Sequence, residues 1–64
     1  VTVAERIEIG KRNHKIISIC LKNYYTREII GFFKHEDEIP KEILLKPSGD
    51  DWDRGFGYLT ITVK

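Results

Sequence analysis

The residues best suited to chemistry lie near the end of the chain, in a run of glycines and aromatic residues. Arg54–Ile61 reads Arg-Gly-Phe-Gly-Tyr-Leu-Thr-Ile. Side chains alternate between the two faces of a strand, so Arg54, Phe56 and Tyr58 share one face. Flat rings on an exposed sheet face stack on unpaired bases, and a cation beside them contacts phosphate. The run therefore predicts a surface that binds single-stranded nucleic acid.

The same alternation leaves an opposite interpretation open. Leu59 and Ile61 are expected to face the core, but a core could equally hold Phe56 and Tyr58 and leave the aliphatic residues half exposed. Three lysines are expected to add diffuse attraction for phosphate on the first interpretation: Lys15, Lys22 and Lys64.

Residues suited to catalysis or metal binding are sparse. The run 35–38 (His-Glu-Asp-Glu) is consecutive and does not match a ligand spacing with a geometric basis. Cys20 lies in an apolar run, which is typical of a buried, inert thiol. The acids that precede the glycine-aromatic run are expected to form a turn: Asp50, Asp51 and Asp53. We predict a protein that is not an enzyme, with no catalytic residue, cofactor or metal.

Length and composition indicate one small domain over residues 1–64. The chain has no methionine, so Val1 need not be the biological start. A single cysteine excludes an internal disulfide and favours a reducing, intracellular and cytoplasmic setting. No stretch approaches the roughly 18 apolar residues of a membrane span. A domain this small is marginally stable alone, which makes a homodimer a further expectation.

Charge is divided unevenly along the chain. The net charge is only +1, which gives little support for strong phosphate binding. Residues 1–35 carry seven basic and three acidic residues, whereas residues 36–64 carry four basic and seven acidic ones. This polarity would suit an oriented partner.

Hydropathy patterns predict three strands, over Lys15–Lys22, Ile39–Lys46 and Arg54–Val63. The first residues are ambiguous. Thr2 and Glu5 fit a capping box, with Gly10 ending a short helix, whereas Glu5–Ile9 alternates as a strand does. Strand is the preferred interpretation. Pro47–Asp53 is expected to be a turn.

The segment Thr26–Phe33 decides the predicted fold. As a helix it is capped by Thr26 and places Ile29, Ile30 and Phe33 on one face. As a strand it would carry apolar groups on both faces. We predict the helix, although Gly31 weakens it by about 1 kcal/mol. The resulting class is α+β, a small antiparallel sheet with one packed helix. The alternative is an all-β, five-stranded small barrel.

From Lys15 to Lys64 the chain resembles an incomplete RNA-recognition motif, which has a ferredoxin-like fold. The octamer Arg54–Ile61 matches the basic-Gly-aromatic-Gly opening of that family's third-strand motif, with Ile61 standing where an aromatic is expected. Thr26–Phe33 is similar to the family's first helix. Departures are the missing second helix and last strand, the acids before the octamer, and the absence of an aromatic at Ile16, Ser18 and Cys20. The octamer is also similar, more weakly, to that of cold-shock domains.

The resemblance implies a non-enzymatic binding module for single-stranded nucleic acid, with RNA favoured. Its implied site residues are Arg54, Phe56, Tyr58, Lys15, Lys22 and Lys64. The alternative is a small protein-binding regulatory domain or inhibitor that uses the same sheet face. Trp52 would then be its partner-binding residue, because tryptophan is enriched among interface hot spots.

Overall fold

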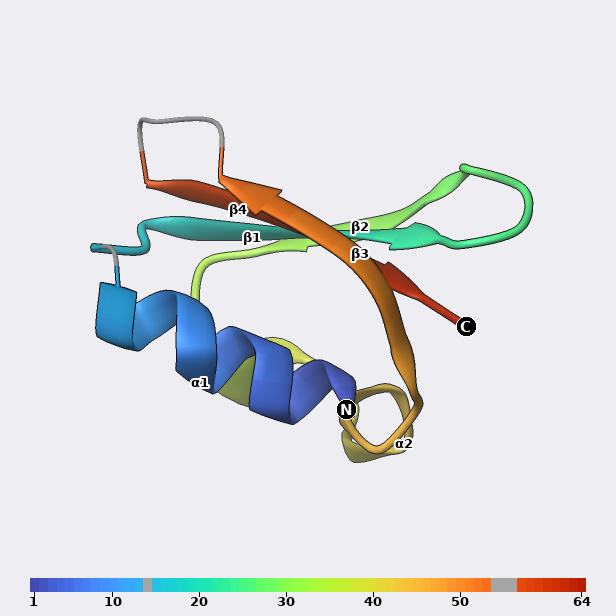
Figure 1. Cartoon of the computed structure of the whole chain (residues 1–64), viewed down its shortest axis with the longest axis horizontal. Coiled ribbons are helices and arrows are strands. Elements are labelled where there is room, and N and C mark those ends of the chain that lie inside the picture. Colours follow the sequence, from blue (N-terminus) through green and yellow to red (C-terminus); the bar gives the residue numbers. More distant parts are fainter. Residues whose placement is uncertain (14, 54–56) are drawn as a thin grey trace.

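The computed structural model is an α+β domain in which a helix packs against one face of an open, four-stranded sheet (Figure 1). It describes residues 1–13, 15–53 and 57–64, with the backbone alone at Trp52 and Asp53. The helix is α1 (Val3–Asn13), and the strands are β1 (Ser18–Asn23), β2 (Ile29–Phe33), β3 (Ser48–Asp53) and β4 (Tyr58–Val63). Two short helices connect β2 to β3: the 3-10 helix η1 (Glu36–Glu38) and α2 (Lys41–Leu44).

The sheet is mixed. Its strand order is β2-β1-β4-β3, with the central strands β1 and β4 parallel and each edge strand antiparallel to its neighbour. The predicted α+β class is confirmed, and the open sheet argues against the five-stranded barrel. The expectation of a wholly antiparallel sheet was wrong, because β1 and β4 are far apart in the chain and their alignment leaves no local signal.

The first residues form a helix and not the preferred strand. The backbone N–H of Thr2 donates to Oε1 of Glu5 at 3.0 Å, and the N–H of Glu5 donates to Oγ1 of Thr2 at 3.2 Å, which is the predicted capping box. Val3, Ile7 and Gly10 are buried at helical spacing. Gly10 does not end the helix. A Cβ there would lie 2.7 Å from Cδ2 of Leu59, so the glycine lets α1 approach β4 closely.

Thr26–Phe33 contains a turn and a strand instead of the predicted helix. The Asn23 side chain accepts hydrogen bonds from the N–H groups of Tyr25 and Thr26 at 2.8 and 3.0 Å. Arg27, at a φ of 64°, lies in the left-handed region. These contacts close the β1–β2 hairpin. Thr26 is therefore a turn residue, and β2 satisfies its backbone groups against β1.

Two later predictions were also wrong. The expected strand Ile39–Lys46 is largely the helix α2, which begins directly after Pro40. Proline suits a helix start because its missing N–H would have no partner there. The expected turn Pro47–Asp53 is mostly the strand β3. Aspartates are uncommon in strands, but here pairing with β4 decides the structure.

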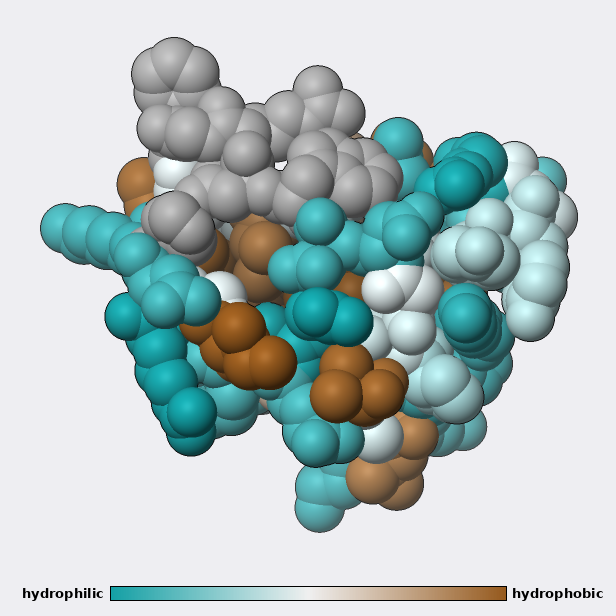
Figure 2. Space-filling view, in the orientation of Figure 1, coloured by the Kyte–Doolittle hydropathy of each residue, from teal (hydrophilic) through white to brown (hydrophobic). Residues whose placement is uncertain are grey.

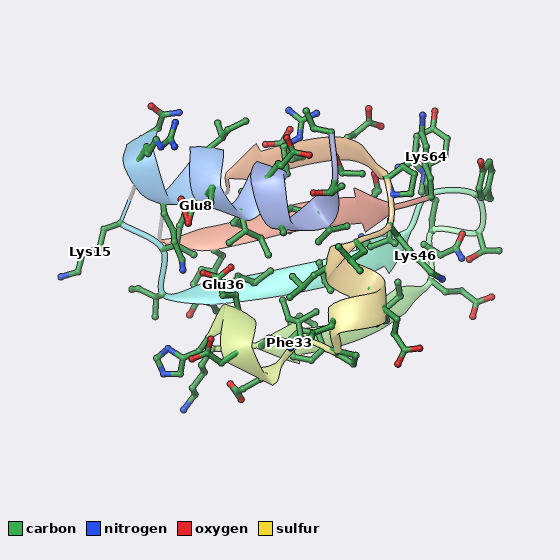
Figure 3. All side chains as sticks on the ribbon, turned by 90° about the horizontal axis from the view of Figure 1, so that it is seen from below. Glu8, Lys15, Phe33, Glu36, Lys46 and Lys64 are labelled. Atoms are coloured by element: carbon green, nitrogen blue, oxygen red, sulfur yellow. The ribbon has the colours of Figure 1, made fainter. Side chains whose placement is uncertain are left out.

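The core lies between the sheet and its helices. Its fully or nearly buried apolar residues are Val3, Ile7, Ile19, Leu21, Ile39, Leu59, Ile61 and Val63. Figure 3 shows α1 over the β4 and β3 side of the sheet, and η1 with α2 over the β1 and β2 side, where Phe33 packs. The helices that the structure describes thus lie on one face of the sheet, and none of them covers the other face (Figure 1).

The capping box makes stability depend on pH. The hydrogen bond from the Thr2 backbone, with that from its side chain, lowers the pKa of Glu5. A carboxyl group whose pKa is lower in the folded than in the unfolded chain stabilises the fold at pH values above its unfolded pKa. This stabilisation is lost as the pH falls through the folded pKa. We expect Glu5→Gln, which does not titrate, to be less stable than the original chain at neutral pH. Urea unfolding should show this difference shrinking in acid. A difference independent of pH would contradict the assignment.

Candidate functional site

The face of the sheet opposite the helices carries an open groove of about 340 Å³. It crosses β2, β1 and β4, and its lining residues are Ser18, Cys20, Lys22, Ile29, Phe32, Tyr58 and Thr60. We call this surface the outer-face groove. On the side of the molecule seen in Figure 2, apolar residues form separate patches between polar ones. The outer-face groove instead gathers aromatic and aliphatic side chains from β2 and β4, on either side of β1.

Alternation along β4 places Tyr58 in the groove. Tyr58 is 52% exposed, whereas Leu59 and Ile61 are 2% and 0% exposed and belong to the core. This is the division of faces that the sequence predicts. Gly57 precedes the strand at a φ of 81°, in the region that favours glycine. A Cβ there would also lie 2.8 Å from Cγ1 of Ile17. The backbone conformation and the contact with Ile17 therefore explain a glycine at this position of the octamer.

Phe32 is a groove residue that the sequence analysis missed. It is 69% exposed and pairs with Cys20 of β1, which in turn pairs with Thr60 of β4. The RNA-recognition motif has an exposed aromatic on its first strand, and β1 of this chain has none. Phe32 of the neighbouring strand β2 supplies a ring beside Cys20 of β1. One signal was present in the sequence: as a strand, Thr26–Phe33 carries apolar residues on both faces. Phe33 packs on the core and Phe32 lies on the open face.

The three predicted lysines lie at different places around the sheet. Lys22 lines the groove. Lys15 lies near the start of β4, since its carbonyl oxygen is 3.0 Å from the position of a Cβ on Gly57. Figure 3 shows Lys15 and Lys64 at opposite ends of the sheet. The structure therefore brings Lys22 into the groove with Tyr58. It places the backbone of Lys15 near the start of β4 without making Lys15 a lining residue, and it leaves Lys64 beyond the carboxyl end of β4.

Tyr24 closes the end of the outer face near Lys64. The Lys64 ammonium lies 4.8 Å from the centre of the Tyr24 ring, and the Arg27 guanidinium lies 5.5 Å from it. Cations over aromatic faces are attracted by the ring quadrupole. A Cβ on Gly49 would lie 2.3 Å from Cδ1 of Tyr24 and 2.5 Å from Oγ1 of Thr62. The ring thus packs directly on the backbone of β3.

Two acids that would be expected to repel phosphate are paired with arginines. Oδ1 of Asp51 lies 3.3 Å from Arg6 of α1, and Oδ2 of Asp50 lies 3.8 Å from Arg27. An acid paired with a cation contributes less negative potential than an isolated one. Neither acid lines the outer-face groove.

Some predicted site residues lie outside the described part of the chain. These are Arg54 and Phe56, together with the side chain of Trp52, whose backbone pairs with Thr60. Within residues 1–13, 15–53 and 57–64, no group of three or more His, Cys, Asp or Glu residues is placed to hold a metal ion. None of the helices described has the length and apolar character needed to cross a membrane.

Comparison of the chain with protein-family models, with curated proteins and with solved structures finds no match. The geometry of the outer-face groove is therefore the basis for a functional interpretation.

The contact between Gly49 and Tyr24 predicts the effect of a substitution. Gly49→Ala must displace either the Tyr24 ring or Thr62, whose hydroxyl donates to the Asp50 carbonyl at 3.0 Å. Overpacking of this kind costs typically about 1–3 kcal/mol. Thermal and urea unfolding should show the loss. Tyr24→Ala in the same chain removes the ring, so the double variant should lose less than the sum of the two single variants. Strict additivity would contradict the contact.

Proposed function

We propose that the protein is a non-enzymatic binding module that takes single-stranded nucleic acid, RNA in preference, on its outer-face groove in an intracellular setting. The observation that carries the proposal is the exposure of Phe32 and Tyr58 on an open sheet face that no helix covers. Exposed rings on a sheet are the common platform for unpaired bases, because every base has a flat face on which to stack.

The positions of the two rings favour an unstacked strand. Phe32 and Tyr58 are separated by β1 and are offset by two residues along the sheet. Strand spacing and rise place their Cα atoms roughly 12 Å apart. Bases stacked on each other rise only about 3.4 Å per step, so neighbouring bases of a duplex would not reach both rings. A single strand with splayed bases can place one base on each ring.

Charge supports phosphate contact on a modest scale. Lys22 lines the groove and Lys15 lies near its Tyr58 end. Arg54 lies outside the described residues, and the sequence alone makes it a third candidate cation. Three phosphate contacts fit a chain of net charge +1 better than an extended basic surface does. The expected binding is therefore weak and dominated by stacking.

Removal of either ring should weaken binding. Base–aromatic stacking contributes about 1–3 kcal/mol per base, so Phe32→Ala and Tyr58→Ala should each lower affinity by roughly 5- to 150-fold. Fluorescence anisotropy with a labelled, mixed-sequence single-stranded RNA measures this effect. Leu45→Ala is the matched control, because Leu45 is 73% exposed but does not line the groove.

Cys20 offers an independent readout of where the ligand lies. It is half-buried on the floor of the outer-face groove and is the only cysteine of the chain. Bound RNA should slow its alkylation by iodoacetamide, and Tyr58→Ala should remove that protection. RNA binding that leaves the alkylation rate unchanged would place the ligand elsewhere and overturn the proposal.

The salt dependence of RNA affinity should distinguish lysines that contact phosphate from a lysine that does not. Each phosphate contact of a single strand contributes about 0.7 to the slope of log affinity against log salt. Lys15→Gln and Lys22→Gln should each reduce the slope by about that amount. Lys64→Gln is the matched control and should change it less, because its ammonium lies over Tyr24 at the far end of the sheet. Equal effects of all three variants would indicate diffuse attraction without a defined phosphate path.

The composition of the groove supports a protein ligand as the second candidate. Among the described lining residues only Lys22 is charged, and Ile29 and Phe32 add aliphatic and aromatic surface. Such a surface suits an apolar peptide as well as a base. The Cys20 assay distinguishes the two candidates. Protection by a hydrophobic peptide, with none by any single-stranded RNA or DNA pool, would favour the small protein-binding regulatory domain.

A further inference from the structure

The hydroxyl-bearing residues on the outer face of β1 and β4 differ in their access to a ligand. Thr62 is 0% exposed, and its hydroxyl donates to the Asp50 carbonyl at 3.0 Å. Thr60 lines the outer-face groove but is only 6% exposed. Ser18 also lines the groove and is half-buried. Of these three residues, Ser18 is therefore the one that a ligand in the groove reaches most readily.

The backbone fixes Ser18 directly beside Tyr58. The two residues are register partners in the parallel pair of β1 with β4. The N–H of Ser18 donates to the carbonyl of Gly57 at 3.1 Å, which ties β1 to the residue that precedes Tyr58. Neighbouring strands lie only about 4.8 Å apart. A base that stacks on the Tyr58 ring and overhangs β1 would therefore have one edge above Ser18.

Phe32 has different neighbours. Its register partner on β1 is Cys20, whose thiol is a weak hydrogen-bond donor. Ser18 lies one strand across and two residues along from Phe32, which separates their Cα atoms by roughly 8 Å. On its own strand the nearest groove residue is the apolar Ile29. The two rings of the groove thus differ, because only Tyr58 has a hydroxyl directly beside it.

We propose that the Ser18 hydroxyl forms a hydrogen bond with the edge of the base that stacks on Tyr58, and that the base on Phe32 is held by stacking alone. This contact rests on the proposed function and adds a polar interaction to it. A hydroxyl both donates and accepts, and single-stranded bases present polar groups along their edges. The contact therefore favours a nucleobase over an apolar ring such as that of phenylalanine, which stacks but has no polar edge.

Fluorescence anisotropy with two labelled strands tests the proposal. One strand is a short oligouridylate, and the other carries phenyl rings in place of the bases, which stack without a hydrogen-bonding edge. Ser18→Ala should lower affinity for the oligouridylate by roughly 2- to 10-fold, the usual effect of one hydrogen bond. It should leave affinity for the phenyl strand unchanged. Ser18→Thr retains a hydroxyl and should bind the oligouridylate about as tightly as the original chain.

Double variants show which ring holds the base. In a Tyr58→Ala chain, Ser18→Ala should cost little more, because no base is then held above Ser18. In a Phe32→Ala chain, Ser18→Ala should keep its full effect. Thr26→Val is the matched control: it removes a hydroxyl from the exposed β1–β2 turn, outside the groove, and should change affinity for neither strand. Urea unfolding checks that each variant folds.

The outcomes separate this contact from the proposed function. Equal losses on both strands would show that Ser18 acts on the structure of the groove and not on a base edge, and would overturn the inference. Oligouridylate binding that protects Cys20 and is unchanged by Ser18→Ala would overturn the inference alone. A chain that binds no single strand and leaves Cys20 unprotected would overturn the proposed function, and the Ser18 contact with it.

Discussion

The parallel pairing of β1 with β4 is the contact on which the rest of the structure depends. Ser18–Asn23 and Tyr58–Val63 align residue for residue, although the rest of the sheet lies between them in the chain. The sheet is in effect two hairpins, β1–β2 and β3–β4, joined by this pair. Leu21 and Ile61 stand opposite each other in it and are fully buried. The inner face packs against α1, and the described residues place no helix on the other face.

The open face explains why β2 resembled a helix in the sequence. A strand with one buried face normally alternates apolar and polar residues. In β2 the inner Phe33 and the outer Phe32 are both aromatic. Local rules that fail in this way are commonly found where a protein binds something. The apolar groups that obscured the strand are those that line the outer-face groove and its edge.

Part of the charge polarity of the chain is used within the molecule. The ion pairs Arg6–Asp51, Lys11–Glu36 and Arg27–Asp50 each join the basic first half to the acidic second half. The hydrogen bond from Lys11 to Glu36 raises the pKa of that lysine. Exposed pairs contribute little individually, but together they connect α1 and the first hairpin to the rest. The polarity therefore does not by itself require a charged partner.

Short-range signals in the sequence determined part of this structure. The capping box of Thr2 with Glu5 and the buried face of Tyr58–Val63 depend on residues a few positions apart. The α+β class was predicted correctly, but from a helix at Thr26–Phe33 that is a turn and a strand, whereas the helix of the structure is α1. Only the tertiary structure decided that Ile29–Phe33 and Ser48–Asp53 are strands, because pairing with β1 and β4 outweighed local propensity. It also decided that Phe32 joins Tyr58 in one groove. Phe32 and Tyr58 are distant in the chain and come to one groove only when β1 and β4 pair in parallel at the centre of the sheet. The hydropathy periodicity of the sequence carries no signal of that pairing.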